Sequence, residues 1–81
     1  MSDVVNTPVK LDLKGLLCPL PVVRIAQAIK KINVGELIEA TATDPGVLAD
    51  IPAWARSTGH ELVTLDKLGP KEFRFVVKRS K

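Results

Sequence analysis

The chain has 81 residues, of which 46% are hydrophobic and 26% are charged, and its formal net charge is +3. This length and composition predict one globular domain and exclude a disordered chain. The single cysteine excludes an intramolecular disulfide framework within this sequence. We do not expect residues 1–7 to form a signal peptide, because no basic region followed by an apolar stretch is present, and no apolar run approaches the roughly 18 residues of a membrane span. We expect a cytoplasmic protein without a membrane partner, because the cytoplasm keeps a lone thiol reduced.

The first half of the chain predicts a tail, a strand and a helix. Residues 1–8 are expected to form a flexible tail, and residues 9–81 a single domain. Strict alternation from Val9 to Lys14 predicts a half-buried strand. Apolar residues then recur at helical spacing between Pro19 and Ile32, and Asn33-Val34-Gly35 ends that pattern.

The middle of the chain repeats this order of strand and helix. Alternation from Glu36 to Thr43 predicts the second strand. Asp44-Pro45-Gly46 is expected to cap a second helical region that runs to about Thr58, with Gly59 as its terminator. Pro52 removes a backbone donor inside this region, so we expect a broken or kinked helix.

Two further strands complete the predicted fold. They run from Leu62 to Leu68 and from Glu72 to Lys78, and Gly69-Pro70 joins them as a hairpin. Alternating strands leave one sheet face in water, and right-handed crossovers that advance in one direction place successive helices together. The predicted class is α+β, a two-layer βαβαββ sandwich with a four-stranded mixed sheet and both helices on one face.

Cys18 lies between Leu17 and the run Pro19-Leu20-Pro21. Proline favours the first helical position, and the residue before it avoids helical angles, so Cys18 is expected to cap the first helix. A second frame starts the helix at Pro21 and leaves Cys18 just outside. A helix terminus contributes roughly 0.3–1 kcal/mol to a nearby charge, less than about one pKa unit, so we expect a moderately activated thiol. The alternative is a cysteine that only packs in the core.

Other kinds of site find little support in the sequence. One cysteine and one histidine cannot supply a zinc site of three or four nitrogen and sulfur ligands, so no metal is expected. His60 follows Gly59 at the far end of the second helix, which favours a loop role over a pair with Cys18. Trp54 shares a helix with Ile51 and is expected in the core.

The segment Gly15-Leu16-Leu17-Cys18-Pro19-Leu20-Pro21 resembles the Cys-Pro-x-Pro signature of the TusA/SirA-like sulfur carriers. The likeness continues through Asp44-Pro45-Gly46, Asp50-Ile51-Pro52-Ala53-Trp54 and Gly59-His60-Glu61-Leu62, and covers nearly the whole chain from Val9 onward. It implies a domain whose cysteine accepts a sulfane sulfur as a persulfide and passes it on without a cofactor. The partners it implies are a cysteine desulfurase or rhodanese-like donor and a DsrE-type or other acceptor, which leads to tRNA thiolation, molybdenum-cofactor enzymes or sulfur oxidation.

The same resemblance assigns roles to individual residues. Cys18 matches the persulfide-forming cysteine, and Gly15, Pro19 and Pro21 belong to the motif and the helix start. Asp12 matches an acidic position in the preceding strand, where a supporting role and a solvent-facing role have equal weight.

The motif departs from the tRNA-thiolation members of the family. Those members often carry a basic residue before the cysteine and an acidic one between the prolines, where this chain has Leu17 and Leu20. We expect these leucines to form an exposed apolar rim that docks a partner protein. Arg24 and Lys31 could add electrostatic steering toward an acidic partner, although solvation alone would also explain them.

Two other functions remain open. The basic charge is compatible with a small RNA-binding or protein-binding regulatory module. The few aromatic residues are predicted to point inward, so direct nucleic-acid binding is not expected. A lone reactive thiol is also compatible with a redox sensor, although no second cysteine is present to resolve a sulfenic acid.

Overall fold

The computed structural model describes residues 8–81, so the tail predicted over residues 1–8 lies, apart from Pro8, outside the described residues. The predicted order of elements is confirmed. The elements are β1 (Val9–Leu13), α1 (Leu20–Ile29), β2 (Leu37–Ala42), α2 (Val47–Thr58), β3 (Glu61–Gly69) and β4 (Glu72–Lys78).

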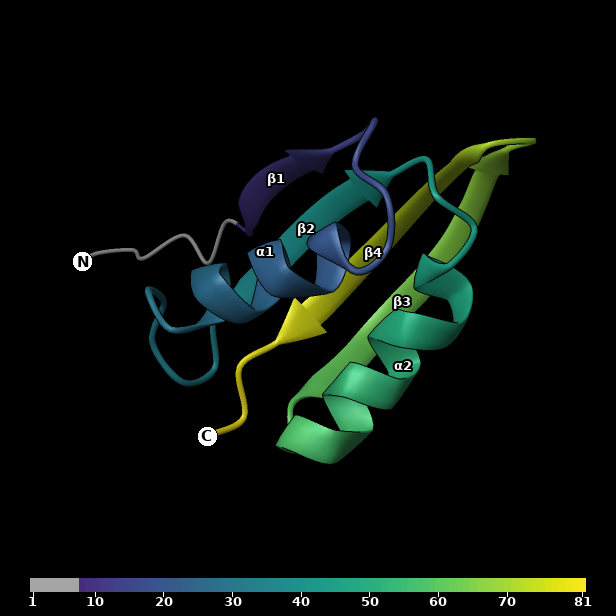
Figure 1. Ribbon diagram of the computed structural model, residues 1–81. Coiled ribbons are helices and arrows are strands. Elements are labelled where there is room, and N and C mark those ends of the chain that lie inside the picture. Colours follow the sequence, from purple (N-terminus) through teal and green to yellow (C-terminus); the bar gives the residue numbers. More distant parts are fainter. Residues whose placement is uncertain (1–7) are drawn as a thin grey trace.

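The four strands form one mixed sheet in the order β1-β2-β4-β3. Strands β1 and β2 are parallel, whereas β4 is antiparallel to both of its neighbours, β2 and β3. The crossovers from β1 to β2 and from β2 to β3 advance across the sheet in the same direction, and both helices lie on the same face (Figure 1). The predicted two-layer α+β fold is therefore confirmed.

The core lies between this sheet face and the two helices. Alternation in β2 and β4 turns one set of residues toward the helices, and α1 and α2 each contribute one apolar face. The fully buried side chains at the centre are those of Ile25, Ile38, Ile51, Phe75 and Val77. Burying a side chain of this kind stabilises the fold by about 1.5–3 kcal/mol.

Both helices differ in detail from the prediction. Helix α1 ends at Ile29 instead of Ile32, because the chain tightens into a turn in which the Lys31 amide donates to the Ala28 carbonyl at 3.0 Å. Helix α2 continues through Pro52, so of the broken or kinked helix that the sequence predicts, the broken form is wrong. One missing backbone hydrogen bond is outweighed there by the burial of the apolar face on either side of the proline. Gly59 ends α2 in the left-handed conformation, at φ 83°, as predicted.

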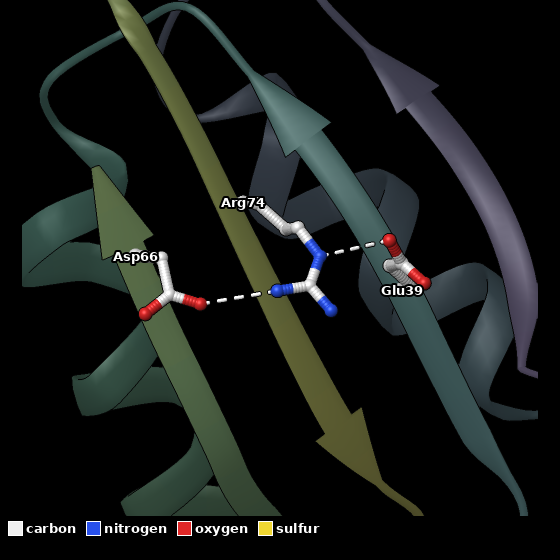
Figure 2. Close-up of polar contacts among 3 residues, drawn as sticks. All are labelled: Glu39, Asp66 and Arg74. Atoms are coloured by element: carbon white, nitrogen blue, oxygen red, sulfur yellow. Dashed lines mark hydrogen bonds and ion pairs between the residues drawn. The ribbon is translucent and has the colours of Figure 1, made fainter. Parts of the chain in front are cut away.

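The other sheet face carries polar side chains and no helix. Arg74, on β4, lies between carboxylates from the two neighbouring strands (Figure 2). Its Nε is 2.8 Å from Glu39 on β2, and its Nη1 is 3.1 Å from Asp66 on β3. Val76, next to this row, is nevertheless buried, so the open face is not uniformly wet.

Candidate functional site

The Cys18 segment lies where the β1–α1 loop meets the β2–α2 loop. Strands β1 and β2 are parallel, so their carboxyl ends reach the same edge of the sheet, and both loops leave from that edge (Figure 1). Gly15 turns the first loop at φ 83°, and its amide donates to the Thr43 hydroxyl at 2.9 Å. A side chain is strained at that angle, which explains why the motif has a glycine here.

Cys18 lies just before α1 and is exposed. The cap of α1 is Pro19, and the peptide bond between Cys18 and Pro19 is cis. The Leu20 amide is not directed to the sulfur, because it donates to the Leu17 carbonyl at 2.8 Å. The expected cap at Cys18 is therefore wrong, and α1 starts between the two predicted frames.

Two carboxylates from the second loop and α2 hold Cys18 instead. The Cys18 amide donates to Asp44 Oδ2 at 2.5 Å, and Cys18 Sγ donates to Asp50 Oδ2 at 2.6 Å. Asp44 also accepts the Gly46 amide through its Oδ1 at 3.1 Å, and Gly46 is the actual cap of α2. The carboxylates thus fix both the backbone and the side chain of the cysteine.

Gly46 brings the second loop close to the sulfur-bearing residue. A β-carbon at this position would lie 3.4 Å from Cys18 Cβ, 3.4 Å from Asp44 Oδ2 and 3.5 Å from Asp50 Oδ2. These are ordinary van der Waals distances, so the Gly46 backbone forms one wall of the site. The Asp50 amide in turn donates to the Gly46 carbonyl at 2.9 Å, which places the Asp50 side chain in the first turn of α2.

The carboxylates raise the pKa of the Cys18 thiol. The hydrogen bond to Asp50 raises the pKa of the thiol above its ordinary value, and partial removal from water and the charges of Asp50 and Asp44 raise it further. The moderate activation that we expected from the helix terminus is therefore wrong. Asp44 was expected only in the cap of the second helix and Asp50 only in the family likeness, so neither was predicted as a partner of the thiol. The signal was available, because parallel strands bring the loops after β1 and β2 to one edge.

The two leucines expected to form the apolar rim, Leu17 and Leu20, are exposed, as predicted. Leu17 has 70% and Leu20 has 45% of its surface in water, whereas Leu16 packs against the core. Leu17 and Leu20 form the apolar rim on either side of Cys18 and Pro19 in the sequence.

Arg24 lies within α1, and Lys31 lies in the turn that follows it. Both are exposed, and both line a groove of about 580 Å³ between α1 and β1. Asp12 lines the same groove, and its Oδ1 accepts the Lys14 amide at 3.1 Å. The structure thus separates these three residues from the contacts of the Cys18 sulfur.

His60 lies at the opposite end of α2 from Asp50. The eight helical steps from Asp50 to Thr58 rise by roughly 12 Å, and His60 lies beyond them, so it forms no pair with Cys18. Its ring is tilted by 35° against Trp54, with the centroids 5.5 Å apart, and its Nδ1 accepts the Ser80 amide at 3.1 Å. Trp54 is half-buried against the core, as expected.

The described part of the chain shows no sign of a metal site or of a membrane-spanning helix. Residues 8–81 contain no cluster of three or more histidine, cysteine or acidic side chains that could hold a metal ion. Over the same residues, neither helix has the length and apolar character that crossing a membrane requires. Phe73 and Phe75 are buried, which leaves few aromatic faces for stacking on bases.

Comparison with known proteins adds independent findings. The sulfur carrier protein TusA of Allochromatium vinosum is 39% identical over 71 residues, which cover 88% of this chain and 92% of that protein. A putative sulfur carrier protein of Archaeoglobus fulgidus is 45% identical over 69 residues, covering 85% of this chain and 90% of the relative. The putative sulfur carrier protein YrkF of Bacillus subtilis is 42% identical over 66 residues, which are 82% of this chain. The chain spans only 36% of the length of that protein and of a similar one from Aquifex aeolicus.

The fold has a counterpart among solved structures. The crystal structure of a SirA-like protein from Desulfitobacterium hafniense superposes with a TM-score of 0.77 and covers 90% of this chain and 99% of its own. Its sequence identity of 15% makes this a likeness of fold alone. A family model described as sulfurtransferase TusA matches residues 9–79, which include the Cys18 segment and both loops around it. With that match and the sequence relatives, the chain belongs to the TusA family.

Proposed function

We propose that this protein is a sulfur carrier that accepts a sulfane sulfur as a persulfide on Cys18 and passes it to a downstream relay or thiolation protein. The observation that carries the proposal is the exposed thiol of Cys18, the only cysteine of the chain, held by hydrogen bonds at the edge where two loops meet. Relatives named as sulfur carriers support it.

The chemistry needs a sulfur that partner proteins can reach. A persulfide forms when the thiolate attacks the sulfane sulfur of a donor, and it is consumed when the thiolate of an acceptor attacks in turn. Both steps need a protein partner whose own sulfur approaches Cys18 closely. An exposed loop cysteine meets this need, whereas a buried one would not.

The partners follow from the same chemistry. We propose a cysteine desulfurase or rhodanese-like protein as the donor and a DsrE-type or other sulfur relay protein as the acceptor. The apolar rim of Leu17 and Leu20 is the docking surface that we propose for them, because exposed apolar side chains beside a reactive group mark protein contacts. The cytoplasm is the compartment in which such a thiol stays reduced.

Loading tests the proposal directly. The protein is incubated with a cysteine desulfurase and cysteine, and its intact mass is measured beside that of Cys18→Ser. We expect the wild type to gain the mass of one sulfur atom, the variant to gain none, and both to melt at nearly the same temperature. Loading of Cys18→Ser would overturn the assignment, and a collapsed fold in this variant would favour a packing role for the cysteine.

A further inference from the structure

The contact between Cys18 and Asp50 assigns Asp50 a role in sulfur transfer, and this inference rests on the proposed function. We propose that Asp50 is a catalytic residue that relays protons: it accepts the Cys18 proton as sulfur is loaded, passes it to the donor thiolate, and gives Cys18 a proton as sulfur leaves. The carrier is then a protonated thiol at rest, and it becomes a nucleophile only as the new sulfur–sulfur bond forms.

The geometry supports a direct proton path. Asp50 Oδ2 is 2.6 Å from Cys18 Sγ, so one hydrogen bond joins the proton acceptor to the reacting atom. Asp50 is half-buried in the first turn of α2, and the Asp50 amide is fixed to the Gly46 carbonyl at 2.9 Å. The carboxylate therefore comes from a helix, which holds it more rigidly than a loop would.

Asp44 has a different part in this arrangement. Its Oδ2 accepts the backbone amide of Cys18 at 2.5 Å and its Oδ1 accepts the Gly46 amide, so both of its oxygens have backbone partners. Asp44 is thus a positioning residue that ties the two loops together. Asp50 Oδ2 is the carboxylate oxygen that contacts the sulfur.

The charges around the thiol favour its protonated state. Asp50 from α2 and Asp44 from the preceding loop both face Cys18, whereas the nearest basic residues in the sequence are Lys14 and Arg24. The hydrogen bond and the two negative charges raise the pKa of the thiol, and none of the basic side chains in the described part of the chain lowers it. A thiol in this state reacts slowly with small oxidants and alkylating agents, because the thiolate is the nucleophile.

Sulfur loading balances without an outside oxidant or reductant. Cys18–SH and a donor persulfide, E–S–SH, give Cys18–S–SH and E–SH. Cys18 Sγ attacks the terminal sulfur of the donor, the donor's sulfur–sulfur bond breaks, and its electron pair leaves on the donor's remaining sulfur. The Cys18 proton passes to Asp50 and then to the donor thiolate.

Unloading runs through the same groups in reverse. The acceptor thiolate attacks the terminal sulfur of Cys18–S–SH, and Cys18 Sγ leaves with the electron pair of the broken bond. Asp50 passes to this sulfur the proton that the acceptor thiol gave up. Prompt protonation makes Cys18 a better leaving group than its raised pKa alone would allow.

The test uses Asp50→Asn, with Glu61→Gln as the matched change of a carboxylate to an amide. Glu61 is exposed at the start of β3, beyond the opposite end of α2. Alkylation of Cys18 by iodoacetamide is followed against pH, and sulfur transfer from a persulfide-loaded desulfurase is followed at pH 7. A fall of one pKa unit raises the thiolate fraction tenfold but lowers its nucleophilicity, so alkylation rises about threefold per unit.

We expect the two readouts to move in opposite directions. In Asp50→Asn the apparent pKa falls and alkylation at pH 7 becomes faster, whereas protein-to-protein transfer slows on the order of tenfold or more, because the proton acceptor is lost. Glu61→Gln changes neither. Faster transfer together with faster alkylation would show that Asp50 only suppresses the thiol, and would overturn the proposal.

The wild type provides a test that does not depend on the folding of a variant. Its alkylation profile should give an apparent pKa above the reference of about 8.5 for a free cysteine. An apparent pKa at or below that reference would overturn the role of Asp50, even with normal sulfur loading. Failure of loading with a raised pKa would instead count against the carrier function.

Discussion

Replacing Leu17 by glutamine tests whether the apolar rim docks partner proteins. Leu17 has 70% of its surface in water, so the substitution removes an apolar side chain that the fold itself covers only in small part. Glutamine is neutral and leaves the charges around Cys18 unchanged, which a glutamate would not do. The matched control is Val34→Gln, because Val34 is 62% exposed and lies in the loop after α1, away from the Cys18 loop.

The exposure of Leu17 sets the size of both effects. A leucine side chain contributes about 1.5–3 kcal/mol when it is fully buried. Docking that covers the exposed 70% therefore accounts for about 1–2 kcal/mol of binding, or roughly a 5- to 30-fold change in affinity. The buried remainder contributes less than about 1 kcal/mol to folding, which lowers the melting temperature by at most about 7 °C.

The assay is sulfur transfer from a persulfide-loaded desulfurase at carrier concentrations below saturation. We expect Leu17→Gln to transfer 5- to 30-fold more slowly, by the binding loss worked out above. Val34→Gln should transfer at the wild-type rate, and iodoacetamide should alkylate all three proteins equally. Unchanged transfer in Leu17→Gln, or equal losses in both variants, would refute docking through the rim.

Three further changes test the fold and its dependence on pH. Burial, and then the charges of Arg79 and Lys81, lower the pKa of His60 below its ordinary 6.5. The folded protein therefore holds a neutral His60 without penalty above pH 6.5, and the free energy of unfolding decreases as the pH falls from 6.5 through the lowered pKa. His60→Gln should make the melting temperature depend less on pH below pH 6.5, and an unchanged slope there would contradict this. The hydrogen bond from Arg74 lowers the pKa of Glu39 below 4.5, so Glu39→Gln should remove a loss of stability that appears only below that pH, as acid titrations followed by circular dichroism can show. Gly15→Ala should cost about 1–2 kcal/mol in urea unfolding, since alanine is strained at a φ of 83°, and a stabilised variant would refute that reading of the turn.

The fold could be predicted from the sequence because each element has a strong local pattern. Alternation around Ile38 and Phe75 identified the buried sheet face, and the glycine at position 59 identified the end of α2. The prediction failed at Pro52, where local propensity argued for a break. The neighbouring Ile51 is fully buried, and this tertiary packing stabilises the helix through the proline. The local sequence pattern does not show how strong that packing is.

The site was predictable only in part. Cys18 and the exposed leucines beside it were predicted from the motif. The state of the thiol did not, because it depends on Asp44 and Asp50, which are 26 and 32 residues away in the sequence. A helix terminus alone would lower the pKa of the thiol, whereas the two carboxylates that the fold brings close raise it.

The most direct test of the central claim follows one sulfur atom onto Cys18 and off again. The protein is loaded by a desulfurase with cysteine, freed of both, and then mixed with a DsrE-type acceptor, and its intact mass is recorded at each stage. We predict a gain of one sulfur atom per chain, located on the peptide that contains Cys18, followed by its loss as the acceptor gains the same mass. A chain that never gains sulfur, or one whose added mass no acceptor thiol can remove, would contradict the carrier function.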